Sequence, residues 1–243
     1  MDPNEEQADG NAELIPLLWA EADHDLRQPL HALFYMTRAL ARSLHEPKQR
    51  ETIQYMEVAL QGLQTKLDLL MELSRIDSGS SVPTLTSCSL KRMCEALSAA
   101  LTDIARAHGI KLRFRLGPAE VISDQALLSM MVRSLILNAL KLANRSDILV
   151  GSRRRAGRIS LVVYFRAAPL SEGQQRGAFV QLATTPATSE LGLGLGFLAH
   201  LGRSLDHSIE CRTLPGHGVC LALSLPAAEN AQGNASCGIE AFP

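Results

Sequence analysis

The sequence predicts an α+β protein in which a helical hairpin precedes an α/β sandwich. In the first third of the chain, leucines and isoleucines recur at helical spacing. A stretch rich in serine and glycine at 78–83 then interrupts the pattern. Beyond it, alternating strand patterns are mixed with further helical ones. From these patterns we expect a disordered N-terminus at 1–10, the hairpin at 11–78, a linker at 79–88, the sandwich at 89–226 and a flexible tail at 227–243.

The hairpin is expected to consist of two long helices joined near residues 45–48. The first runs from about residue 12 to 44, with Pro29 predicted to kink it. Its apolar residues are assigned to one stripe: Leu26, Leu30, Leu33, Leu40 and Leu44. The second helix ends at about Asp77 and has a similar stripe. One hairpin cannot bury all of this apolar surface, so we expect a homodimer with a four-helix bundle.

The α/β sandwich is expected to place helices on one face of a mixed sheet. Ser89 is predicted to cap its first helix. Residues 153–155, three arginines, are interpreted as a solvated turn, and the alternative is a phosphate or partner site. The expected elements are helix 89–107, strand 110–116, helix 125–143, strands 147–152 and 158–165, a loop or lid at 166–190, a helix to 203, and strands 208–213 and 219–225.

The composition restricts the compartment and the partners. Apolar residues make up 46% of 243 residues and aromatics only 4%, which predicts an aliphatic core. A net charge of -1 gives no electrostatic case for nucleic acid or an anionic membrane. The five cysteines lack metal-ligand spacing, so we expect reduced thiols in a cytoplasmic protein. The acidic N-terminus and the absence of a long apolar run predict neither a signal peptide nor a membrane span.

Polar residues cluster in the first helix around His24. A neutral imidazole is nucleophilic near pH 7, and Asp25 can orient the ring or accept its proton. Gln28 lies four residues on and therefore on the same helix face, while Arg27 could compensate negative charge. Phosphoryl transfer requires this kind of positioning and charge compensation. The alternative is a solvated histidine beside a surface salt bridge.

Residues 24–30 (His-Asp-Leu-Arg-Gln-Pro-Leu) resemble the phosphoacceptor box of two-component sensor histidine kinases. The hairpin resembles the dimerisation and phosphotransfer domain of that family. Residues 89–226 resemble its ATP-binding domain, which belongs to the gyrase and chaperone ATPase superfamily. The resemblance implies that His24 is the phosphoacceptor. It also implies response-regulator receiver domains as partners, with an upstream hybrid histidine kinase as a further one.

The resemblance also marks a vestigial nucleotide site. Asn138 stands where that family has a magnesium-binding asparagine, and Lys141 where it has a phosphate contact. Gly192 and Gly194 stand in the second glycine-rich box, which opens a helix at the nucleotide phosphates. Alternatively, Asn138 hydrogen-bonds a neighbouring loop and the glycines form a plain entry to a helix.

Several positions depart from the family pattern. A gapless match places Phe165 at the aspartate that reads the adenine amino group, and Ala167 and Pro169 at two glycines. A one-residue shift would place Arg166 there instead. Losing that buried acceptor should cost about 1–3 kcal/mol. Glu190 replaces the leading glycine of the second box. We therefore do not expect normal ATP affinity, and ATP and magnesium are expected as cofactors only if the chain is a kinase.

Three functions follow from the resemblance. The first is a degenerate kinase acting as a histidine phosphotransferase, in which His24 exchanges phosphoryl groups with receiver aspartates. The second is a divergent but active histidine kinase. The third is a non-enzymatic regulator-binding protein or a phosphatase, because Gln28 occupies the position of the family's phosphatase residue.

Overall fold

The computed structural model describes residues 25–43, 46–143, 146–167, 192–214 and 218–228. It divides into two compact units, Met1–Pro83 and Thr84–Pro243, and the division falls within the stretch predicted to be a linker. The first unit is helical and the second contains the sheets. The predicted α+β class, with helices first and an α/β domain after them, is confirmed.

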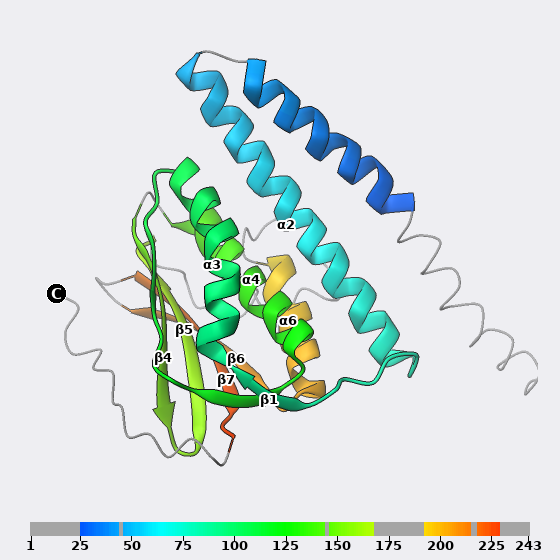
Figure 1. The fold of residues 1–243 in the computed structure, drawn as a ribbon, viewed down its shortest axis with the longest axis vertical. Coiled ribbons are helices and arrows are strands. Elements are labelled where there is room, and N and C mark those ends of the chain that lie inside the picture. Colours follow the sequence, from blue (N-terminus) through cyan, green and yellow to red (C-terminus); the bar gives the residue numbers. More distant parts are fainter. Residues whose placement is uncertain (1–24, 44–45, 144–145, 168–191, 215–217, 229–243) are drawn as a thin grey trace, which may run out of the picture. The chain divides into compact units, whose positions relative to one another are not determined.

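The helical unit is an antiparallel hairpin. Its first helix covers residues 25–43, and α2 covers Pro47–Asp77 (Figure 1). Pro47 suits the first turn of α2, because backbone N–H groups in a first turn have no partner within the helix and proline lacks this group. The preceding residue, Glu46, has an extended backbone. After α2, Gly79 adopts a positive φ of 72°, which ends the helical path. An ion pair of 2.8 Å between Arg27 and Asp68 joins the two helices.

Only part of the leucine stripe predicted for the first helix is buried within the hairpin. Leu30 is buried, but the side chains at the other described stripe positions are about half exposed, with 53% for Leu26, 50% for Leu33 and 48% for Leu40. The buried positions instead include Thr37, seven residues after Leu30. The stripe is therefore wider than the contact with α2, and one edge of it is exposed. Leu44 lies outside the described residues.

A five-stranded sheet forms the α/β unit. Its strand order is β2-β4-β5-β7-β6, and every pair is antiparallel except β2 with β4. The strands are β2 Leu112–Arg115, β4 Ile148–Arg155, β5 Arg158–Phe165, β6 Ser208–Leu214 and β7 Gly218–Pro226. The helices α3 Leu90–Ala107, α4 Gln125–Leu142 and α6 Gly192–Ser204 pack against one face of it (Figure 1). The sheet and these helices form the predicted two layers.

The sequence alternation of the central strands builds the core. Residues in register across the sheet, such as Val150, Val163 and Leu221, are fully buried on the helix side. α4 lies over them and is long and apolar enough to cross a membrane by composition alone. However, 61% of that stretch is buried inside the unit, so its apolar side chains are accounted for by packing.

Two local features differ from the sequence prediction. A second, two-stranded sheet pairs β1 (Thr86–Ser89) with β3 (Glu120–Ser123), and four-residue strands give too little alternation to be recognised. The arginines at 153–155 lie in strand β4 and not in a turn. The turn is formed by Ala156 and Gly157, both with positive φ, which suits the tight connection of a hairpin.

Candidate functional site

The predicted phosphoacceptor His24 lies immediately before the described part of the first helix, outside the described residues. Asp25 and Gln28 follow it on that helix, and both are exposed. Arg27 is half-buried and forms the ion pair with Asp68 of α2. Its guanidinium therefore holds the two helices of the hairpin together beside the predicted phosphoacceptor.

The predicted magnesium and phosphate contacts lie in α4. Asp124 begins this helix by accepting hydrogen bonds from the backbone N–H groups of Ala126 (3.0 Å) and Leu127 (3.1 Å). Asn138 is 7% exposed, and its Nδ2 has no hydrogen-bond partner in the described structure. Lys141 lies three residues later, and partial desolvation of its ammonium group lowers its pKa from the usual value. This pattern leaves a buried amide available to a polar ligand.

The other wall of the family's nucleotide site would be the end of β5. Phe165, the last residue of this strand, is fully buried on the helix-facing side of the sheet. Gly218, at the start of β7, approaches it so closely that a Cβ there would lie 2.3 Å from the Phe165 carbonyl oxygen. The backbone of Arg166 is held by the Ser146 hydroxyl through hydrogen bonds of 3.0 and 3.1 Å. Phe165, with the backbone of Gly218 packed closely against its own, thus occupies the position expected for the carboxylate that reads adenine.

The glycine-rich segment is only partly described. Gly192 and Gly194 lie in the first turn of α6. The structure therefore places both predicted glycines at a helix start, as the sequence predicted. Pro169, Glu190 and the predicted lid lie outside the described residues.

The described residues fit a bound nucleotide only in part. The unpaired Nδ2 of Asn138 is a hydrogen-bond donor and suits a phosphate oxygen. Adenine recognition, however, requires a buried acceptor, and neither Phe165 nor Arg166 supplies a carboxylate. Among the described residues no group of three or more His, Cys, Asp or Glu side chains could hold a metal ion.

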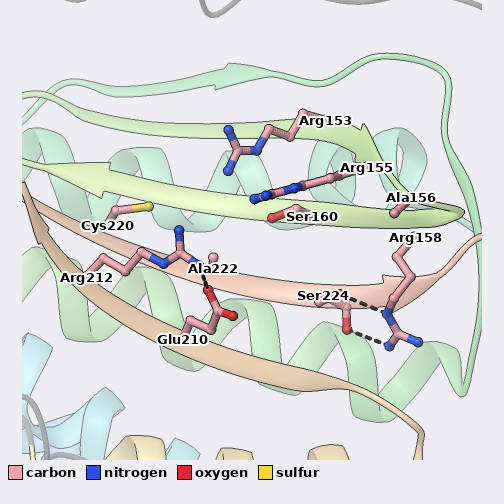
Figure 2. A pocket seen from close by; sticks show the side chains of 10 residues that line it. All are labelled: Arg153, Arg155, Ala156, Arg158, Ser160, Glu210, Arg212, Cys220, Ala222 and Ser224. Carbon is pink, nitrogen blue, oxygen red and sulfur yellow. Dashed lines mark hydrogen bonds and ion pairs between the residues drawn. The ribbon is translucent and has the colours of Figure 1, made fainter.

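A cluster of arginines on the outer face of the sheet includes two of the three consecutive arginines, for which a phosphate or partner site was only the alternative in the sequence. Arg153 and Arg155 project from β4, and Arg158 and Arg212 from β5 and β6 (Figure 2). The three consecutive arginines were the available signal. Their strand conformation, which sends alternate side chains to opposite faces, was the missing information.

A known protein family matches the helical part of the chain. Residues 17–79 match the model of the "His Kinase A (phospho-acceptor) domain". This range includes His24, Asp25, Arg27 and Gln28, and it coincides with the helical hairpin.

Similar curated proteins are histidine kinases by name. The chain is 27% identical over 220 residues to the sensor-like histidine kinase SenX3 of Mycolicibacterium smegmatis, covering 85% of this chain and 56% of the relative. It is 23% identical over 220 residues to the sensor histidine kinase MtrB of Mycobacterium tuberculosis, covering 85% and 38%. The chain thus spans about half or less of the length of these relatives.

Solved structures show the same fold. Full-length ShkA in complex with AMPPNP matches 88% of this chain and 46% of its own, with a TM-score of 0.62 and 17% identity. The Acinetobacter baumannii histidine kinase AdeS matches 84% of this chain and 97% of its own, with a TM-score of 0.56 and 16% identity. Residues 17–79 thus match a phosphoacceptor domain of the histidine kinase type, and the chain has the fold of solved histidine kinases.

Proposed function

We propose that this protein is a histidine phosphotransferase whose phosphate comes from a partner's aspartyl phosphate and not from ATP. The observation that carries this proposal is the fully buried Phe165 ring at the end of β5. In the family pattern this position reads adenine, and here it offers no acceptor. The phosphoacceptor hairpin, by contrast, keeps its histidine, its neighbouring carboxylate and its amide.

The transfer chemistry requires little beyond the hairpin. A ring nitrogen of His24 attacks the phosphorus of a receiver's aspartyl phosphate. The new N–P bond forms as the P–O bond to the aspartate breaks, and the receiver carboxylate leaves. Asp25 can take up the proton that the phosphorylated ring releases. Reversal of the same steps passes the group to a second receiver.

Dimerisation and partner binding complete this proposal. Exposed apolar residues on the first helix follow a spacing of seven, three and four residues: Leu26, Leu33, Met36 and Leu40. On α2, Met56 and Leu63 are also exposed and are seven residues apart. Such a repeat fits the seam of a four-helix bundle with a second copy. We therefore infer a cytoplasmic homodimer that binds response-regulator receiver domains, with an upstream hybrid histidine kinase as the phosphate source.

The test compares two phosphate donors on the purified full chain. Radiolabelled ATP with magnesium should give no label on His24, because the adenine acceptor is missing. A phosphorylated receiver domain should label the wild type but not His24→Ala. His31→Ala, an exposed histidine seven residues along the same helix, is the matched control and should be labelled normally.

Label from ATP that disappears in His24→Ala would overturn the phosphotransferase and identify a kinase. No label from either donor would leave a regulator-binding protein without phosphotransfer. A Gln28→Ala variant then tests phosphatase activity, since loss of receiver dephosphorylation in this variant would assign that activity to Gln28.

A second function, a divergent ATP-dependent kinase, is favoured by Asn138. Its buried amide nitrogen has no partner among the described residues, which is costly unless a ligand or water satisfies it. Calorimetry with a non-hydrolysable ATP analogue separates the two functions. Binding that requires Asn138 would favour the kinase, and no binding at millimolar analogue would favour the phosphotransferase.

A further inference from the structure

The outer face of the sheet, opposite α3, α4 and α6, carries a basic hollow of about 360 Å³ (Figure 2). Its rim consists of Arg153, Arg155, Arg158 and Arg212, with Glu210 as the one acidic residue lining it. All of these residues belong to the α/β unit. The hollow therefore lies on a different face from Asn138 and Phe165, and it is independent of the function proposed above.

The hollow exists because short side chains lie between long ones. Strand pairing brings Arg153, Ser160 and Ser224 into one row across β4, β5 and β7. Ala222 lies in the adjacent row, also on the outer face. Serine and alanine make a low floor, and the arginines stand around it. The floor also offers two hydroxyl groups that can donate hydrogen bonds.

The arginines differ in how they are neutralised. Arg158 forms an ion pair of 3.0 Å with Asp206 and donates from Nε to the Ser224 hydroxyl at 2.9 Å. Arg212 pairs with Glu210. No ion pair or hydrogen bond of the Arg153 or Arg155 side chain is found within the described ranges. Two exposed guanidinium groups are thus available on one strand.

Arg155 adds an uncompensated positive charge beside Arg158, whose own charge is already compensated by Asp206. Arg155 and Arg158 are directly opposite each other in the β4–β5 pairing. Like charges at such positions destabilise a sheet. A bound anion would compensate the charge of Arg155, for which the described residues supply no paired carboxylate.

The spacing indicates the kind of anion. Arg153 and Arg155 are two residues apart on one strand and project from the same face, so their Cα atoms are about 6.7 Å apart. Planar guanidinium groups bind phosphate oxygens in pairs. A hollow of this volume suits a small ligand. We propose that the hollow binds a small molecule that carries two adjacent phosphate groups, with Arg153 and Arg155 as its principal contacts.

Isothermal titration calorimetry with inorganic pyrophosphate tests this site on the full chain. The wild type should bind pyrophosphate at least about 10-fold more tightly than inorganic phosphate, because two guanidiniums engage two groups. The double variant R153Q/R155Q should weaken pyrophosphate binding at least about 10-fold. R92Q/R106Q changes two exposed arginines of α3 by the same net charge and should bind as the wild type does.

Thermal unfolding checks that the variants fold. R153Q/R155Q should be at least as stable as the wild type, because the substitutions remove positive charge beside Arg158. Pyrophosphate should raise the melting temperature of the wild type and not of R153Q/R155Q. Three results would each overturn the proposal. The first is equal affinity of the wild type for phosphate and pyrophosphate. The second is that R92Q/R106Q weakens pyrophosphate binding as much as R153Q/R155Q does. The third is that K141Q loses pyrophosphate binding while R153Q/R155Q keeps it, which would place the ligand near Asn138.

Discussion

At the residue scale, burial gives His207 an unusual acid–base behaviour. Its side chain is 4% exposed, and its Nε2 contacts only the Ile122 carbonyl oxygen, at 3.5 Å. Desolvation, reinforced by the charge of Arg158, lowers the pKa of His207 to about 4, and Asp206 opposes this shift only in part. The neutral imidazole is therefore part of the folded core, whereas the unfolded chain would protonate this residue near pH 6.5.

This difference predicts a loss of stability on mild acidification. The folded state binds fewer protons than the unfolded state between pH 6.5 and 4, so the stabilisation is complete above pH 6.5 and decreases as the pH falls towards 4. Between pH 7.5 and 5, His207 should account for about 2 kcal/mol of lost unfolding free energy. Urea unfolding followed by circular dichroism at both pH values measures it.

The variant His207→Leu should remove most of this pH dependence, and His200→Leu, a partly exposed histidine of α6, should keep it. Equal pH dependence in the wild type and His207→Leu would show that folding does not lower the pKa of His207.

At the element scale, the start of α4 depends on one carboxylate. Asp124 Oδ1 caps the helix, and its Oδ2 accepts a hydrogen bond of 2.9 Å from the backbone N–H of Thr84. The same side chain therefore fixes the beginning of α4 and the segment that leads into β1. Since α4 forms much of the core and carries Asn138 and Lys141, its position determines the candidate nucleotide site.

Removal of this cap should destabilise the α/β unit. Asp124→Ala should cost about 1–2 kcal/mol of unfolding free energy, because three backbone N–H groups lose their acceptor. Asp103→Ala removes an exposed carboxylate that pairs with Arg106 on α3 and should cost less than about 0.5 kcal/mol. Equilibrium urea unfolding of both variants checks the difference, and equal costs would contradict a capping role.

The elements also show where sequence reasoning succeeds. Long periodic segments and capped helices were predictable, because α2 and α4 combine regular apolar spacing with recognisable ends at Pro47 and Asp124. The short strands β1 and β3 were not, since four residues carry too little pattern and their pairing is between distant segments. The arginine hollow was missed for a related reason. It depends on the register of β4, β5 and β7, which a local pattern does not contain.

At the scale of the whole molecule, the two units have different requirements. The α/β unit buries its own core, whereas the hairpin leaves a regular apolar face exposed. Leu30 is buried inside the hairpin, whereas Leu33, three residues later, is exposed. This pattern is expected when each helix packs against one helix of its own hairpin and one of a second copy. The sequence alone predicted the need for a dimer but not which edge of the stripe is buried within the hairpin.

The proposed dimer can be broken at the exposed face. Leu33→Glu would bury two carboxylates in the bundle and should weaken the dimer at least about 100-fold, giving a monomer at micromolar concentration. Ala39→Glu adds the same charge at an exposed position outside the apolar repeat and should remain dimeric. Sedimentation velocity distinguishes the two states. A wild type that sediments as a monomer would show that something other than a second copy covers this face.

The margins of the five-stranded sheet have a separate consequence for association between molecules. β2 and β6 form the two edges of the sheet, and an open edge can template the addition of a foreign strand. β2 carries Arg113 and Arg115, and β6 alternates Glu210 and Arg212 along its outer side. Charges at these positions discourage strand-by-strand growth into fibrils. Copies of the chain can therefore meet through their helices at high concentration while their sheets stay separate.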